Sequence, residues 1–100
     1  MRLIARSNLA VFAARHPETA TALDTWHARV KGGRWQSMAE VGAAFSKAKS
    51  VSGDRIRFEV AGGDYRLIAA FDFGRQLVFV KFVGTHAEYD RVDAATVAQF

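Results

Sequence analysis

The sequence has no cysteine and no long apolar run, and each absence excludes a class of protein. Without cysteine the chain can form neither disulfides nor thiolate metal sites, which fits a cytoplasmic protein. No stretch of about eighteen or more apolar residues is present, so we expect no transmembrane helix and no membrane partner. The opening string "MRLIARSNLA" also lacks the apolar core and the cleavage site of a signal peptide.

Acidic residues are outnumbered as well, with 10 Asp and Glu against 14 Lys and Arg, giving a net charge of +4. Half of the 100 residues are hydrophobic, enough for one folded domain, 1–100, with a modest core. The basic balance favours an anionic partner, either nucleic acid or an acidic protein, but an ordinary basic surface explains it equally well. The question is whether the cations gather on one face.

The first half of the chain has helical periodicity. A short strand is expected at 2–5, followed by two helices, the second of which Gly32 and Gly33 would end. The string "SMAE" at 37–40 is a capping box that would open a third short helix. The polar segment 46–54 is expected to be a loop.

The second half changes to strand-like patterns, and "DRIRFEV" at 54–60 alternates polar and apolar residues. The strings "DRIRFEV", "DYRLIAAFDF" and "QLVFVKFV" predict three strands, joined by tight turns at Gly62-Gly63 and Gly74-Arg75. "THAE" at 85–88 is a second capping box and predicts a short C-terminal helix. Together the patterns predict an α+β fold, with an N-terminal strand and two to three helices packed on one face of an antiparallel sheet.

Two-residue turns would fix the pairing of these strands. Directly opposed residues share a face of the sheet, and four opposed pairs are expected: Arg57 with Ile68, Ile68 with Lys81, Glu59 with Arg66, and Arg66 with Val83. The core face then collects Ile56, Phe58, Val60, Tyr65, Leu67, Ala69, Phe71, Val78, Val80 and Phe82. The opposite face collects Arg55, Arg57, Glu59, Arg66, Asp72 and Lys81, with Ile68, Ala70, Leu77, Phe79 and Val83 between them.

The cations of this second face have two explanations. Arg57, Arg66 and Lys81 could grip a phosphate, and His86 and Tyr89 follow the last strand at the end where Arg66 lies. Alternatively, exposed strands often carry charge, and Glu59 opposite Arg66 would be an ordinary cross-strand ion pair. Metal chemistry has little support, because the three His residues are far apart and none is spaced i, i+4.

The order of these elements resembles the RelE-type toxin fold. The string "FEVAGGDYRLIAAFDFGRQLVFVKFVGTHAEYD" resembles more specifically the HigB family of bacterial type II toxin–antitoxin systems. The Gly-Gly turn followed closely by Arg66 and the ending "THAEYD" carry the likeness. The resemblance implies a RelE-like domain acting as an mRNA interferase, a metal-independent endoribonuclease without cofactors that cuts mRNA, usually on the ribosome. A HigA-like helix-turn-helix antitoxin would neutralise it.

The motif assigns site residues to this sequence. The resemblance implies Arg66, His86 and Tyr89 as catalytic residues: Arg66 on the scissile phosphate, His86 as general acid or base, and Tyr89 stacking on a base or orienting a proton. Arg57, Lys81 and Arg55 are expected to bind RNA on the same face. Two other readings stay open: a non-catalytic RNA- or ribosome-binding module using this basic face, and an interaction domain for an acidic protein.

Overall fold

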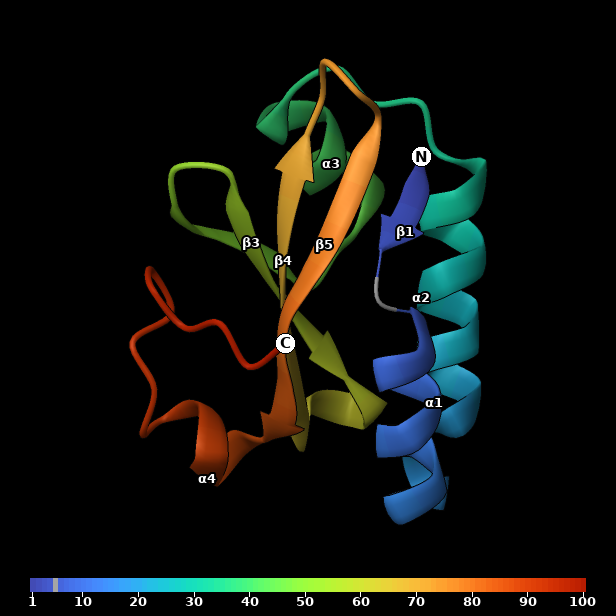
Figure 1. Cartoon of the computed structure of the whole chain (residues 1–100), viewed down its shortest axis with the longest axis vertical. Coiled ribbons are helices and arrows are strands. Elements are labelled where there is room, and N and C mark those ends of the chain that lie inside the picture. Colours follow the sequence, from blue (N-terminus) through green and yellow to red (C-terminus); the bar gives the residue numbers. More distant parts are fainter. Residues whose placement is uncertain (5) are drawn as a thin grey trace.

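The computed structural model describes residues 1–4 and 6–100 and contains a five-stranded sheet in the order β1-β5-β4-β3-β2 (Figure 1). The strands are β1 (Arg2–Ile4), β2 (Ala48–Ser52), β3 (Arg55–Val60), β4 (Tyr65–Asp72) and β5 (Leu77–Thr85). The helices are α1 (Arg6–Arg15), α2 (Ala20–Gly32), α3 (Met38–Ala44) and α4 (His86–Tyr89). The predicted α+β fold is confirmed, with its N-terminal strand, helices and short C-terminal helix.

The helices α1 and α2 cover one face of the sheet, while α4 and the chain that follows it lie on the opposite side (Figure 1). We call the second side the outer face. The core lies between the helices and the sheet, where Leu23, Trp26 and Val30 of α2 join the apolar residues of β3, β4 and β5. Apolar residues three or four apart on a helix form one stripe, which explains why this face of α2 is buried.

Two strand predictions are corrected. Segment 46–54, expected to be a loop, contains β2, which pairs antiparallel with β3. Its side chains are polar or small and mostly exposed, so only the pairing with β3 makes it a strand. The N-terminal strand β1 pairs parallel with β5, and the sheet is therefore antiparallel except at that edge. Position 5, the last of the predicted N-terminal strand, lies outside the described residues.

The first hairpin has the predicted register. Arg57 lies opposite Ile68 and Glu59 opposite Arg66, although the connection is a four-residue loop rather than a two-residue turn. Positive φ angles at Ala61, Gly62 and Gly63 reverse the chain within this loop. Glycine adopts this left-handed backbone readily, which explains why the Gly-Gly pair marks the turn.

The second hairpin has the predicted register only near its turn. Pairing runs as expected up to Ala69 opposite Val80, and then a β-bulge shifts it by one residue. Beyond the bulge Ile68 pairs with Phe82 instead of Lys81, and Arg66 pairs with Gly84 instead of Val83. These two predicted pairs are wrong, because Lys81 is an extra residue in β5 without a partner of its own.

The bulge exchanges the faces of two apolar residues. Val83, predicted on the outer face, pairs with Leu67 and joins the core. Phe82, predicted in the core, pairs with Ile68 and therefore projects from the outer face. Both side chains are nearly inaccessible to solvent, so the outer face is itself partly covered. Within the described ranges, no helix is long and apolar enough to cross a membrane.

Candidate functional site

The cations of the outer face come from three adjacent strands. Arg55 and Arg57 belong to β3, Arg66 to β4 and Lys81 to β5, as the alternation of each strand requires. Lys49 of β2 lies opposite Arg57 and so projects from the same face. We had not singled out Lys49, because its segment was expected to be a loop. The pairing of β2 with β3 therefore adds a further cation to the predicted group.

Arg66 is the most deeply placed of these cations, with only 8% of its surface exposed. Its Nη1 donates hydrogen bonds to the backbone carbonyls of Gly63 and Tyr65, and its buried Nε has no partner in the described part of the chain. The expected cross-strand ion pair with Glu59 does not form. The Glu59 carboxylate instead lies 3.6 Å from Nη2 of Arg57. The Arg66 guanidinium thus interacts with carbonyl dipoles. Among residues 1–4 and 6–100, no carboxylate lies within ion-pair distance of it.

Arg57, on the neighbouring strand β3, is likewise a largely buried arginine with an unsatisfied Nε. Its side chain is 18% exposed, and its Nε is also buried without a hydrogen-bond partner among the described residues. A buried N–H donor that has lost water and gained no acceptor is costly, and such groups call for an explanation in terms of strain, water or a bound group. Within the described ranges, Arg57 and Arg66 therefore each contain a buried Nε without a partner, on adjacent strands of the outer face.

The capping box predicted at 85–88 is present and fixes where α4 begins. Thr85 Oγ1 accepts a hydrogen bond from the Glu88 backbone N at 3.1 Å, and Glu88 Oε1 accepts one from the Thr85 backbone N at 2.8 Å. The bond from the Thr85 N–H is the main reason that the pKa of Glu88 is lowered. The backbone N of His86 donates to the Asp64 carbonyl at 2.9 Å, which ties the start of α4 to the loop before Arg66.

His86 has a carboxylate partner that the sequence analysis missed. Its Nδ1 lies 3.1 Å from Oδ2 of Asp90, one helical turn further on. The i, i+4 spacing of the two residues was the available signal. With the Nδ1 proton donated to Asp90, neutral His86 keeps the lone pair of Nε2 as an acceptor. The imidazole is 53% exposed, so this nitrogen is accessible to a substrate.

Tyr89 packs on the outer face against Phe82, the residue that the β-bulge turns from the core to the outer face. Its ring centroid is 6.3 Å from that of Phe82, and the side chain is half-buried. Arg66 and His86 meet at the same end of the β4–β5 hairpin, because Arg66 pairs with Gly84, two residues before His86. In the described ranges, no hydrogen bond or ion pair joins Arg66, His86 and Tyr89 to one another. The register and the position of α4 place the three residues at the same end of the hairpin.

The two remaining predicted residues contact the C-terminal segment, residues 93–100. Nη1 of Arg55 donates to the carbonyls of Ala94 at 3.2 Å and Val97 at 2.6 Å. The Lys81 carbonyl accepts from the Gln99 backbone N at 2.9 Å, while the Lys81 ammonium lies 5.4 Å from the Phe79 ring centroid. The C-terminal segment therefore binds to β3 and β5 and covers part of the outer face.

This arrangement suits an anion that also undergoes proton transfer. Arg66 and Arg57 offer buried N–H donors, Lys81 and Lys49 add mobile charge, and His86 lies at the same end as Arg66. Guanidinium groups bind phosphate oxygens strongly, and an exposed imidazole exchanges protons near neutral pH. The outer face thus has the components of a phosphate site with an acid or base beside it.

Comparison with protein families gives one match. Residues 19–92 match HigB_toxin, described as the RelE-like toxic component of a toxin–antitoxin system. The matched stretch contains α2, the whole of strands β2 to β5, and α4, and so includes each candidate site residue. A comparison with curated proteins finds no match. The chain belongs to the HigB family of RelE-like toxins, as its Gly-Gly turn and "THAEYD" string indicated.

Proposed function

We propose that this toxin is a metal-independent endoribonuclease that cuts mRNA, bound to the ribosome, and thereby inhibits translation. The observation that carries the proposal is the state of Arg66: a buried guanidinium with an unsatisfied Nε and no carboxylate partner within the described residues, at the sheet end where His86 lies. A purely structural arginine would be expected to have its donors satisfied.

RNA supplies its own nucleophile for this reaction. The 2′-OH attacks the adjacent phosphorus as a base removes its proton, and the 5′-oxygen leaves as an acid donates one. The products are a 2′,3′-cyclic phosphate and a 5′-OH end. Arg66, assisted by Lys81 or Arg57, would stabilise the charge that develops on the phosphoryl oxygens. His86 would act as the general acid or base through Nε2.

The remaining residues would place the RNA. Tyr89 would stack on a base or orient a proton, with its ring supported by Phe82. Arg57, Lys81 and Lys49 would contact the backbone along the outer face. Arg55 would contribute through Nε and Nη2, since its Nη1 is engaged by the C-terminal segment. This division separates residues for chemistry from residues for binding.

A toxic component of a toxin–antitoxin system implies a cognate antitoxin. We propose that this antitoxin is HigA-like with a helix-turn-helix, and that the toxin acts in the cytoplasm, where translating ribosomes are found. The alternative function is a non-catalytic RNA- or ribosome-binding module that uses the same basic face. The guanidinium groups of Arg57 and Arg66 would serve either function, so RNA cleavage has to be measured directly.

The test uses purified protein, mRNA and ribosomes, with RNA ends mapped. Wild type should produce 5′-OH ends and cyclic phosphates without added metal. His86→Ala should lower the cleavage rate by about 10²–10⁴-fold, the usual contribution of a general acid or base. Arg66→Lys keeps the charge but loses the fork that binds two oxygens, and should also lose most activity. Arg75→Ala, in an exposed turn, is the control and should cleave normally.

Folding and antitoxin binding are measured for each variant, so that a loss of activity is not confused with a loss of structure. Normal cleavage by both His86→Ala and Arg66→Lys would refute the assignment of the site. Ribosome binding by wild type without any new RNA ends would favour the non-catalytic module.

A further inference from the structure

Basic side chains gather a second time, away from the outer face, in an open hollow of about 550 Å³. The hollow lies between β1, the start of α1 and the end of α2. Its lining includes Arg2, Arg6, His27, Lys31 and Arg34, and none of its lining residues in the described part of the chain is acidic. Four cationic residues thus line the hollow, from three separate elements and a loop.

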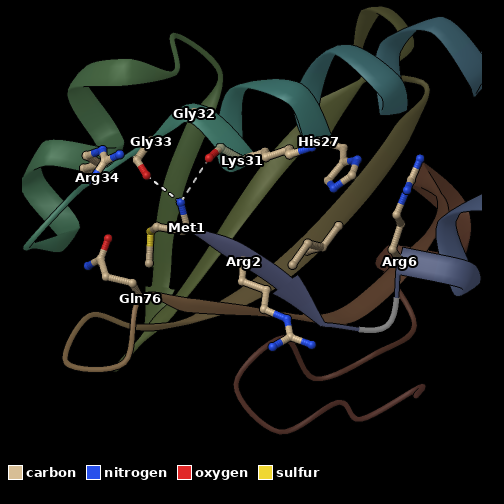
Figure 2. Close-up of a pocket in the computed structure, with 10 residues that line it drawn as sticks. Met1, Arg2, Arg6, His27, Lys31, Gly32, Gly33, Arg34 and Gln76 are labelled. Carbon is tan, nitrogen blue, oxygen red and sulfur yellow. Dashed lines mark hydrogen bonds between the residues drawn. The ribbon is translucent and has the colours of Figure 1, made fainter.

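Three of these basic residues form the centre of the group. Figure 2 shows the side chains of Lys31 and Arg6 on either side of the His27 ring, while the Arg2 guanidinium points away from α2. His27 and Lys31 are four residues apart on α2 and so share one face of the helix. Arg6 approaches from α1. We call Arg6, His27 and Lys31 the α1–α2 cation cluster.

Two cations and one carboxylate act on His27. The pKa of His27 is lowered, first by burial and then by the charges of Arg6 and Lys31, although nearby Asp24 acts in the opposite direction. At the other end of the hollow the Met1 amino group donates to the carbonyls of Val30, Lys31 and Gly33, and its pKa is lowered by burial and by the charge of Arg34. Like charges held close together repel one another, and an anion in the hollow would relieve that repulsion.

Helix stability explains Lys31 but not Arg6. Lys31 lies in the last turn of α2, where a cation interacts favourably with the helix dipole. Arg6 is the first residue of α1, whose first turn contains no acidic residue, and there a cation opposes the dipole. Arg6 is also exposed, so burial of its side chain does not compensate. A ligand would account for a cation at this position.

We propose that the α1–α2 cation cluster binds phosphate groups of a nucleic-acid backbone, as a second site separate from the outer face. The Arg6 guanidinium can hold two phosphate oxygens, and the Lys31 ammonium provides a mobile point charge. An acidic polypeptide is less well suited, because peptide interfaces depend on apolar anchors. Among the lining residues in the described ranges, only Met1 and Leu3 offer substantial apolar side chains.

The test measures binding of a short 2′-O-methyl oligonucleotide, which lacks the nucleophile and cannot be cut. Replacing two phosphate contacts in Arg6→Gln/Lys31→Gln should weaken binding about tenfold at low salt and reduce the slope of log K against log salt by about 1.4. The double variant Arg15→Gln/Arg75→Gln removes the same charge from exposed positions elsewhere and should change the slope by much less. Arg15 and Arg6 lie at opposite ends of α1.

A second measurement uses the wild-type protein and keeps the proposal testable if a variant unfolds. The ring resonances of His27 should shift when the oligonucleotide is added, since a phosphate between Arg6 and Lys31 would touch the imidazole. Equal weakening by the two double variants, or an unmoved His27 ring, would overturn the proposal. A poly-glutamate peptide that competes as well as the oligonucleotide would overturn it too, and would identify the hollow as a site for acidic protein.

These outcomes are independent of the proposed nuclease activity. Arg66 and His86 are intact in every variant, and the oligonucleotide cannot be cleaved. Failure of mRNA cleavage together with a shifted His27 ring would leave the second site standing. Normal mRNA cleavage together with unshifted His27 resonances would support the nuclease activity and overturn the second site.

Discussion

Arg66 combines a buried charge with partners that are only dipoles. Bringing a guanidinium out of water is costly unless hydrogen bonds replace the lost solvation. Here the carbonyls of Gly63 and Tyr65 provide part of that replacement, and the charge itself is not neutralised. The side chain is also confined by its burial, so little rotamer freedom would be lost when an anion binds. Both properties favour a preorganised phosphate contact.

Asp90 should affect proton transfer by His86 without touching the RNA. In Asp90→Asn the amide no longer favours the tautomer with a proton on Nδ1, and we expect a cleavage rate lower by roughly tenfold. Asp54→Asn removes an acidic group from an exposed turn and is the control. An unchanged cleavage rate in Asp90→Asn would contradict a role for this pair.

Gly63 should resist substitution for two separate reasons. Its φ is +94°, and a Cβ would lie 2.8 Å from Glu59 Oε1. We expect Gly63→Ala to lower the free energy of unfolding by about 1–3 kcal/mol, measured by urea denaturation. Gly42 in α3 meets no atom within 4 Å, and Gly42→Ala should raise stability by about 0.5–1 kcal/mol. If the two substitutions changed the free energy of unfolding similarly, the left-handed backbone of Gly63 would not be the reason that this position requires glycine.

The two ends of α1 give a prediction at the scale of the element. Arg6 opposes the helix dipole and Arg15, in the last turn, complements it. Arg6→Gln should therefore raise the free energy of unfolding by about 0.3–1 kcal/mol, and Arg15→Gln should lower it by a similar amount. Denaturation at low salt, where screening is weakest, is the appropriate measurement. If both variants changed the free energy of unfolding in the same direction, Arg6 would not be destabilising the start of α1.

The capping box of α4 should make stability depend on pH through Glu88. The folded state lowers the pKa of this carboxyl below 4.5, so its contribution is present above that value and is lost as pH falls through the lower, folded pKa. Thr85→Ala removes the N-cap oxygen and should cost about 1 kcal/mol at neutral pH. Glu88→Ala should destabilise the protein at pH 7 and much less in strong acid. A loss that did not diminish in acid would mean that the carboxylate is not the group involved.

Most of the elements could be predicted from periodicity, turn residues and capping boxes, and the exceptions share one cause. The bulge in β5 leaves no mark on the sequence, since "QLVFVKFV" is apolar apart from Gln76 and Lys81 and is typical of an unbroken strand. Strand β2 has no apolar face and forms because β3 is beside it. Likewise, the contacts of Arg55 with residues 94 and 97 join distant parts of the chain. Long-range pairing decided each of these features, and local pattern could not reveal it.

The candidate site was also predictable only in part from the sequence. The register of the first hairpin places Arg57 and Arg66 on one face, and the sequence was sufficient for that. Their burial and unsatisfied Nε groups depend on the surrounding fold and were not predictable. Lys49 was hidden by the failure to predict β2, whereas Asp90 was available from its spacing to His86 and was overlooked.

At the scale of the whole molecule, the C-terminal segment should contribute to stability. Its removal after Asp93 would free Arg55 and expose the apolar residues beneath it on the outer face. Hydrogen bonds to a charged group are worth about 1.5–3 kcal/mol, and we expect a loss of that order in thermal or urea unfolding. Removal of Phe100 alone, an exposed residue, should have little effect. Equal stability of the shortened and full chains would show that these contacts are weak.

The α1–α2 cation cluster belongs to the two helices that cover one face of the sheet, and the cations of the candidate site project from the outer face, in a molecule about 33 × 26 × 24 Å in size. This separation affects how many segments of nucleic acid one protein molecule can bind. A protein that binds anions on both sides can hold two segments of nucleic acid at once, and covering one side leaves the other open. Near equal concentrations such a protein would link RNA molecules into larger assemblies, which excess RNA would dissolve. A complex with an antitoxin over the outer face would then still adhere to RNA.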